Sequence, residues 1–283
     1  MQDFEYIDET LDTSLTQSYI LSIQVSLNGF SFCILDKVRK KYIVLKHINI
    51  DHNLHQEDFL DTLEDIIENN ELLNNNNFLS SKLIFVNNKS SIIPTSLFNK
   101  NDLIKYIKLN HHINELDEIH YQKLSYINAY SVFTIPNLVA NIFAKKFKNI
   151  KFYNQNIPFI NFAMLKHHND NAKVSVNFNN DNIDIAVIKN GELLLSNNFK
   201  LKNISDATFY IMYVFKQLEL NPEKNHLFLS GLIDKTSAYF LDLKKYVRFI
   251  NFEKKSEEYT NSYTFKNIYQ HTFLNLQNLI NCE

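Results

Sequence analysis

Two stretches of the chain, one near the N-terminus and one in the second half, alternate hydrophobic and polar residues in the same order. In the first, residues 21–27 alternate with the two-residue period of a strand that buries one face. Asn28-Gly29 follows, a dipeptide typical of tight type I′ turns in which both central residues have positive φ. The alternation resumes over 30–34, and 42–48 is a further strand candidate. This region is therefore predicted to be an antiparallel meander.

The same order returns from Lys173 onward. Residues 174–178 and 183–187 alternate in the same way and are separated by an asparagine-rich turn. Asn190-Gly191 is a second hairpin signal and leads into a third strand that ends at Phe199. The chain is therefore predicted to contain a second meander.

Each meander is followed by apolar residues at helical spacing and then by a short apolar run. In the first half these are residues 56–73 and 83–86, and in the second half 205–218 and 226–231. Both halves thus have the order strand, strand, strand, helix, strand. Because a crossover helix brings the last strand back parallel to the first, we predict an α/β fold with mixed sheets.

The length and hydrophobic content indicate two domains. The chain has 283 residues, of which 45% are hydrophobic, which is enough for two sizeable cores. A polar run at 167–172 is the expected boundary. It gives a first domain over 1–170 and a second over 171–262.

Charge and composition exclude several classes of protein. The net charge is −2 and no basic stripe is present, so no nucleic-acid partner is expected. The glycines are far apart, at Gly29, Gly191 and Gly231, which excludes a Walker A loop, a Rossmann fingerprint and a Gly-x-Ser-x-Gly elbow. Cys33 and Cys282 form neither a disulfide framework nor a zinc site.

The N-terminus favours a cytoplasmic protein. It is acidic and lacks the basic start and the apolar run of a signal peptide. No uninterrupted apolar run reaches the roughly 20 residues that span a bilayer, so no membrane insertion is expected.

The doubled order of elements resembles the actin-like ATPase fold, which is shared by actin, Hsp70 chaperones, sugar kinases and pilus-assembly actin homologues. More narrowly, it resembles a bacterial family of unknown function assigned to that fold. The resemblance covers nearly the whole chain and implies duplicated, ribonuclease H-like domains that face each other across a nucleotide cleft. It also implies that a closing helix at 263–281, whose apolar residues run over 265–280, packs back onto the first domain.

The cleft motifs of nucleotide-binding members match this chain less well than the architecture does. Their first hairpin carries an Asp-x-Gly-Thr type motif, and its aspartate position falls on Gln24 with the turn at Leu27-Asn28-Gly29. The aspartate of their second hairpin falls on Asn177, and the glycine-rich turn falls on Asn179-Asn180-Asp181. Where their adenosine motif has Gly-Gly, this chain has Ser230-Gly231.

Gln24 and Asn177 thus keep the positions of the family's aspartates and lose their negative charge. An amide is a poor substitute for a carboxylate in holding hydrated Mg²⁺, which favours anionic oxygen ligands. Phosphate loops use glycine because the backbone must approach the anion closely, although Asn179 and Asn180 tolerate the left-handed conformation and can still form a turn. We therefore interpret the cleft as degenerate, with no catalytic residue, metal or cofactor, and the residues named above as its vestigial lining.

Two aspartates flank the second hairpin. Turn chemistry is the expected role of Asp181, and a strand position facing solvent or the cleft is expected for Asp184. The alternative makes Asp184 a surviving cleft carboxylate.

The leading functional hypothesis is a non-catalytic actin-like protein that presents surfaces to a protein partner. The alternative is an enzyme, an ATPase or small-molecule kinase that uses ATP with Mg²⁺. A third hypothesis is a sensor that binds nucleotide without hydrolysing it.

Overall fold

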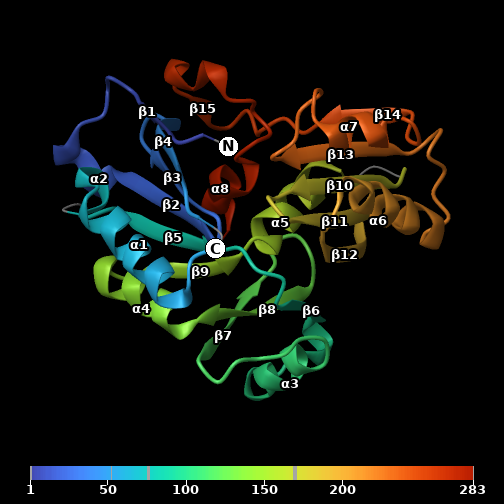
Figure 1. Cartoon of the computed structure of the whole chain (residues 1–283), viewed down its shortest axis with the longest axis horizontal. Coiled ribbons are helices and arrows are strands. Elements are labelled where there is room, and N and C mark those ends of the chain that lie inside the picture. The colour runs from blue at the N-terminus through green and yellow to red at the C-terminus, as the bar shows by residue number, and fades with distance from the viewer. Residues whose placement is uncertain (1, 52, 75–76, 168–170, 283) are drawn as a thin grey trace.

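Two mixed sheets, one in each half of the chain, form two lobes (Figure 1). The computed structural model describes residues 2–51, 53–74, 77–167 and 171–282. The domain boundary expected at residue 170 therefore lies outside the described residues.

The first sheet is built on the first meander. β2, β3 and β4 pair antiparallel, and after α1 and α2 the chain returns as β5, which runs parallel to β2. The strand order is β1-β4-β3-β2-β5-β9, and β15 also pairs with β4. The elements of this lobe are β1 (Phe4–Ile7), η1 (Thr13–Ser18), β2 (Tyr19–Ser26), β3 (Gly29–Asp36), β4 (Lys41–Asn49), α1 (Gln56–Glu68), α2 (Glu71–Asn74), β5 (Ser80–Phe85), α4 (Asn137–Lys146), β9 (Lys151–Asn154) and β15 (Thr260–Asn261).

The second sheet repeats this arrangement with the order β12-β11-β10-β13-β14. β10, β11 and β12 form the antiparallel meander, and α6 leads to β13, which is parallel to β10. Its elements are β10 (Lys173–Phe178), β11 (Asn182–Lys189), β12 (Glu192–Lys200), α6 (Ile204–Gln217), β13 (His226–Gly231), α7 (Ala238–Leu243) and β14 (Phe249–Phe252). The predicted fold class, with a meander, a helix and a parallel strand in each half, is confirmed.

A separate antiparallel sheet, β6-β8-β7, projects from the first lobe (Figure 1). Two strands are expected between residues 119 and 136, but the sequence does not indicate that they join β6 rather than the main sheet. Alternation predicts a strand and not its partner, because pairing is decided by contacts that are distant in sequence. This part contains β6 (Ser90–Pro94), η2 (Thr95–Leu97), η3 (Lys100–Asp102), α3 (Leu103–Lys108), β7 (Asp117–Lys123) and β8 (Ala129–Pro136).

The helix α5 (Asn156–Lys166) lies between the two lobes (Figure 1). It is buried from Asn156 through Met164, polar residues included, which is why its sequence has no one-sided apolar stripe. Ala186 and Ile188 of β11 belong to the same hydrophobic core as the first sheet. The lobes therefore share packed side chains as well as a connection.

The closing segment differs from the continuous helix expected over 263–281. It consists of η4 (Tyr263–Asn267), α8 (Leu274–Asn278) and η5 (Leu279–Asn281). The break has a structural cause, since the carbonyl of His271 accepts the Gly231 N–H at 2.8 Å and its ring donates to the Ile233 carbonyl at 2.7 Å. These two bonds attach the backbone at His271, between η4 and α8, to the second lobe.

The end of this segment packs on the first sheet. Phe273 and Leu276 share a core with Cys33 and Leu35 of β3. The buried Lys82 ammonium of β5 donates to the carbonyls of Leu279 (3.2 Å), Ile280 (3.1 Å) and Cys282. One segment thus contacts both lobes.

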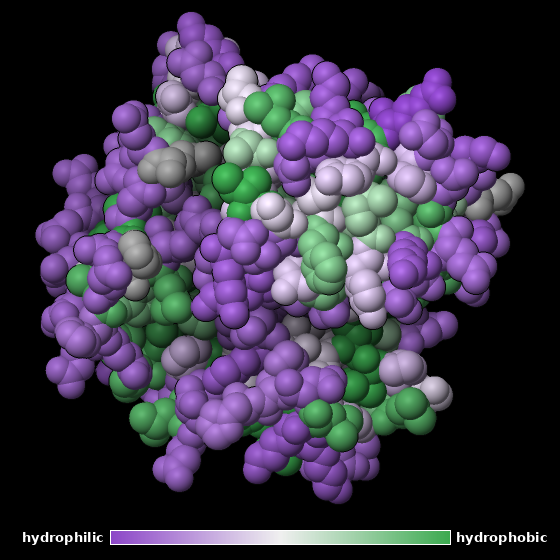
Figure 2. Space-filling model, turned by 45° about the vertical axis from the view of Figure 1, so that its right-hand side comes forward, coloured by the Kyte–Doolittle hydropathy of each residue, from purple (hydrophilic) through white to green (hydrophobic). Residues whose placement is uncertain are grey.

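Hydrophilic residues cover most of the face shown in Figure 2, and hydrophobic residues lie between them in separate patches. None of the helices in the described part of the chain has both the length and the hydropathy that crossing a membrane requires.

Candidate functional site

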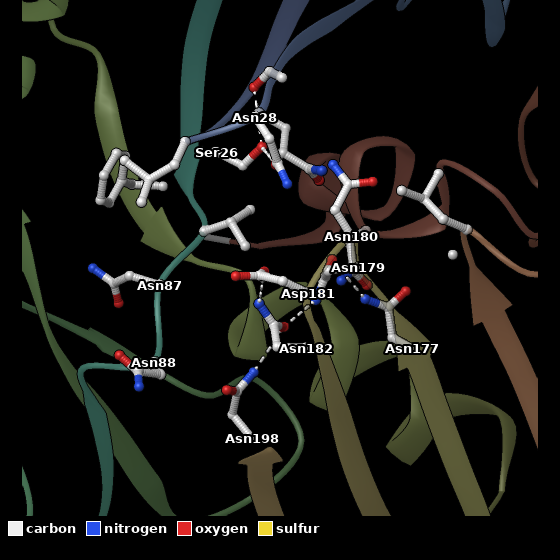
Figure 3. A pocket seen from close by; sticks show the side chains of 18 of the residues that line it. Ser26, Asn28, Asn87, Asn88, Asn177, Asn179, Asn180, Asp181, Asn182 and Asn198 are labelled. Atoms are coloured by element: carbon white, nitrogen blue, oxygen red, sulfur yellow. Dashed lines mark hydrogen bonds between the residues drawn. The ribbon is translucent and has the colours of Figure 1, made fainter. Parts of the chain in front are cut away.

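A cavity of about 540 Å³ lies between the lobes. Its walls come from the β2–β3 hairpin and the β5–β6 loop on one side and from the β10–β11 turn on the other (Figure 3). The structure places on its lining all but one of the site residues expected from the sequence, namely Gln24, Asn28, Gly29, Asn177, Asn179, Asn180, Asp181 and Gly231. Ser230 is buried behind this lining, where its hydroxyl donates to Asn177 Oδ1 at 3.1 Å.

The first hairpin differs in one detail from its sequence prediction. Gly29 has no positive φ, so the type I′ geometry expected at Asn28-Gly29 is wrong. A Cβ on Gly29 would be crowded, because it would lie 3.1 Å from His47 Cε1 and the ring would have to shift by a few tenths of an ångström. At Asn190-Gly191 the prediction is confirmed, with φ of 53° and 75°.

A hydrogen-bonded relay behind Gly29 supports this hairpin. The Ser31 hydroxyl donates to His47 Nδ1 at 2.8 Å, His47 Nε2 donates to Asn49 Oδ1 at 3.3 Å, and the Asn49 amide donates to Asp3 Oδ1 at 2.7 Å. Burial lowers the pKa of His47, which favours the neutral ring that this pattern requires. Both ring nitrogens are engaged and Ser31 is only 3% exposed, so the pair supports the hairpin and leaves no exposed nucleophile.

The second hairpin turns without any left-handed residue. The Asn179 N–H donates to the Asn182 carbonyl at 2.9 Å and closes the turn. Gly231, the retained glycine of the adenosine-type motif, packs directly against this hairpin. Its φ is +82°, and a Cβ would lie 2.1 Å from the Phe178 carbonyl oxygen. The packing of the two strands alone therefore requires glycine at this position.

Asp184 is fully buried behind the β10–β11–β12 wall instead of facing solvent. Its carboxylate accepts hydrogen bonds from the side-chain amides of Asn198 (2.7 Å), Asn179 (2.9 Å), Asn177 (3.3 Å) and Gln155 (3.4 Å). Burial raises the pKa of this carboxyl group, and the amide hydrogen bonds oppose that shift. Sequence analysis notices Asp184 but not this cage, because Gln155 and Asn198 are distant in the chain.

The remaining charged groups of the cavity are few. Lys89 forms an ion pair with Asp117 at 2.7 Å, and Asp181 and Lys200 also line the space. Within the described ranges, no group of three or more histidine, cysteine, aspartate or glutamate side chains is arranged to hold a metal ion. Sequence reasoning missed the lining from the β5–β6 loop, Asn87, Asn88 and Lys89, since no motif marks it.

A second hollow, of about 510 Å³, lies between α6 and α7. The aromatic residues of its lining, Phe209, Tyr213 and Tyr246, are exposed. It shares no lining residue with the cleft.

The duplicated sheets and the cleft between them define a protein of the actin-like ATPase fold. A solved structure from Bacteroides thetaiotaomicron, described as having this fold and unknown function, has a TM-score of 0.82 at 23% identity and covers 97% of this chain and 100% of that one. Residues 8–250 match the model of the family described as protein of unknown function (DUF3822), and the chain belongs to that family. The resemblance to an uncharacterised actin-like family is thus confirmed.

Two further solved structures share the fold at lower identity. The PilM–PilN type IV pilus biogenesis complex has a TM-score of 0.60 at 10% identity and covers 92% of this chain and 97% of that chain. The ethanolamine utilization protein EutJ from Carboxydothermus hydrogenoformans has a TM-score of 0.50 at 8% identity, with 96% and 91% covered. No curated protein matches the chain.

Proposed function

We propose that this protein is a non-catalytic member of the actin-like fold, with a cleft that no longer supports metal-dependent ATP hydrolysis, and that it acts by binding a protein partner. One observation carries the proposal. The amides Gln24 and Asn177 line opposite walls of the cleft, at the positions where the resembled nucleotide-binding proteins have aspartates. The pair keeps the geometry of those positions without their charge.

The chemistry of the lining supports this. Mg²⁺ keeps its waters and is held through carboxylates and phosphates, which neutral amides replace poorly. Lys89 is the lining cation of the β5–β6 loop, and its charge is compensated by Asp117 at 2.7 Å. A triphosphate would therefore meet little uncompensated positive charge on this wall.

The proposal of a protein partner rests on fold-level analogy. The structurally similar PilM–PilN protein is described as a complex, and a chain of that fold thus has a protein partner. We assign the same kind of role to this protein and leave the partner unnamed.

Nucleotide titration tests the proposal that the cleft does not support metal-dependent ATP hydrolysis. Binding to the folded state alone raises stability by about 2.7 kcal/mol at a ligand concentration of 100 times Kd, which a thermal-shift assay detects. We expect no magnesium-dependent shift with ATP or ADP and no phosphate release. The double variant Gln24→Asp, Asn177→Asp is expected to gain at most weak Mg-nucleotide binding.

Magnesium-dependent turnover by the wild type, abolished in Asn177→Ala, would overturn the proposal in favour of an ATPase or kinase. A thermal shift with ATP in the absence of phosphate release would instead support a nucleotide sensor. The cavity volume of about 540 Å³ is within the range of small-molecule sites, which is the observation that favours this second candidate.

Affinity capture from native lysate tests the partner half. We expect a partner that wild type captures and that Asn28→Arg, a cleft variant with an added bulky charge, does not. Phe209→Ala in the α6–α7 hollow is the matched control on a separate surface. Equal capture by wild type and the cleft variant would contradict binding through the cleft.

A further inference from the structure

Four asparagines, Asn177, Asn179, Asn182 and Asn198, form the second-lobe wall of the cleft, here called the amide wall (Figure 3). A carboxamide has two N–H donors and one oxygen with two lone pairs. Both donors of Asn179 are used, on Asp184 Oδ2 at 2.9 Å and Asn182 Oδ1 at 2.7 Å. Both donors of Asn198 are used as well, on Asp184 Oδ1 at 2.7 Å and Asn182 Oδ1 at 3.0 Å.

The other two amides around Asp184, those of Asn177 and Gln155, also direct their N–H groups toward its carboxylate. Asn177 Nδ2 donates to Asp184 at 3.3 Å and to Asn179 Oδ1 at 3.2 Å. Gln155 Nε2 donates to Asp184 at 3.4 Å and to the Asn87 carbonyl at 2.6 Å. The buried carboxylate thus fixes which end of each amide points inward, and it takes up their N–H groups.

The oxygens of the amide wall retain accepting capacity. Asn179 Oδ1 accepts one hydrogen bond, from Asn177, and Asn177 Oδ1 accepts one, from Ser230. Within the described part of the chain, Asn198 Oδ1 accepts none. Among the described residues, Asn177, Asn179 and Asn198 therefore offer the cleft oxygens that accept hydrogen bonds and no spare donor. Asn182 differs, because its Oδ1 already accepts twice and its Nδ2 donates once, to Asp181 Oδ1 at 3.1 Å.

The negative charge of Asp184, which lies behind the wall, also favours a positively charged ligand. All four side chains that bond Asp184 are neutral, and its carboxyl group is 0% exposed. A carboxylate buried among neutral partners keeps a desolvation cost that a nearby cation would reduce. Asp181 adds a second negative group to the same lining, and Lys200 is exposed at its edge.

We propose that the amide wall binds a cationic hydrogen-bond donor, an ammonium or guanidinium group, and that Asp184 is the positioning residue that sets this preference. The inference rests on the proposed function, and the group is a lysine or arginine side chain of the protein partner. The same wall rejects phosphate, because phosphate at neutral pH is anionic and chiefly accepts hydrogen bonds. Asp184 acts through the asparagines and does not itself touch the ligand.

The test compares two probes that differ in charge and hardly in shape, N-acetyl-arginine amide and N-acetyl-citrulline amide. Affinities are measured by following the side-chain amide resonances of ¹⁵N-labelled protein. We expect the arginine probe to bind at least about tenfold more tightly than the citrulline probe, since hydrogen bonds from a charged donor are the stronger ones. Inorganic phosphate is expected to leave these resonances unmoved.

Asp184→Asn is expected to lose the preference, because the charge is gone and one amide must turn its donors toward the cleft. Asp181→Asn is the matched control, since it removes a cleft carboxylate that accepts from Asn182 Nδ2 at 3.1 Å and from none of the four amides that bond Asp184, and it should keep most of the preference. Asn198→Ala leaves Asp184 intact and removes one wall oxygen. It should lower the affinity for the arginine probe, which keeps the inference testable if circular dichroism shows that Asp184→Asn does not fold.

Equal affinity for the two probes, no binding of either, or a preference that both Asp184→Asn and Asn198→Ala retain would overturn the inference. Phosphate release measured on the same preparations separates this outcome from failure of the proposed function. If no phosphate is released and the probes do not discriminate, only the cation preference is wrong. If magnesium-dependent release is seen, the proposed function itself fails.

Discussion

At the scale of single residues, the two glycines with positive φ are held by different constraints. Gly191 has φ of 75° with open space around its Cα, whereas Gly231 has φ of 82° and a backbone oxygen 2.1 Å from the position of a Cβ. Both positions resist a side chain, but only Gly231 also lacks the room for one.

Replacing each by alanine separates the two effects. Gly191→Ala should destabilise by about 1–2 kcal/mol, the cost of the left-handed conformation. Gly231→Ala adds overpacking and should cost about 2–5 kcal/mol in all. Urea denaturation measures both values, and equal losses would contradict the steric account.

Buried histidines make stability depend on pH. Burial lowers the pKa of His47, His120 and His271 in the folded state, and the carboxylate of Glu118 only partly opposes this at His120. The unfolded chain then binds more protons below its histidine pKa of about 6.5, so the folded state loses stability as the pH falls through that value.

We therefore expect the free energy of unfolding to decrease from about pH 7.5 to about pH 5.5, a window above most carboxyl titrations. His47→Gln should reduce the slope of this dependence. The measurement is urea denaturation at several pH values for both proteins. A stability that rises on acidification in this window would contradict the assignment.

At the scale of elements, the closing segment illustrates how tertiary bonds replace helix propensity. Its α8 and η5 are buried almost all round, including Asn275, Gln277 and Asn278. Their attachment depends on side chains from other elements, such as the Tyr42 hydroxyl, which donates to the Gln277 carbonyl at 2.5 Å.

Lys82→Met tests this attachment. It removes charge-assisted bonds to the carbonyls of Leu279, Ile280 and Cys282, each of which is worth about 1.5–3 kcal/mol, and should cost several kcal/mol. Lys151→Met is the control, because Lys151 is the exposed register partner of Lys82 on β9 and should change stability by less than about 0.5 kcal/mol. Hydrogen exchange should show faster opening over 274–282 in Lys82→Met alone.

At the scale of the whole molecule, the lobes are joined through packed side chains. Ala186 and Ile188 of the second sheet share a core with the first, and α5 is buried between the lobes. Separating the lobes would expose this surface to water.

We therefore expect both sheets to unfold in one cooperative transition. Native-state hydrogen exchange should give the same opening free energy for the central strands β3 and β10. As a control, β6–β8 lies in its own sheet and should open at lower free energy. Two separate transitions for the main sheets would contradict this coupling.

Much of the architecture can be predicted from sequence because its signals are local. Alternation over 21–27 and 174–178 indicates strands, and helical spacing indicates the crossovers that make the sheets mixed. Asn190-Gly191 forms the expected turn because both residues tolerate positive φ, although the same dipeptide at Asn28-Gly29 does not adopt it. The order of elements was enough to predict the actin-like fold.

The composition of the cleft wall was predictable only in part. Gln24 and Asn177 were expected at the cleft from the hairpin motifs of the resembled fold, and both line the cavity. The third sheet, the Asp3–His47–Ser31 relay and the lining from Asn87 depend on contacts between segments far apart in the chain, which no local pattern records.

The sequence by itself determined the strands, the crossover helices and the amides Gln24 and Asn177 of the two hairpins. Tertiary structure decided that His47 crowds Gly29 and that the Phe178 carbonyl leaves room only for glycine at Gly231. It also decided that Asp184 is buried among amides from β10, the β10–β11 turn, β12 and the residue that precedes α5. The physical reason is that propensity acts through neighbouring residues, whereas steric room, burial and hydrogen-bond partners depend on which distant segments the fold brings together.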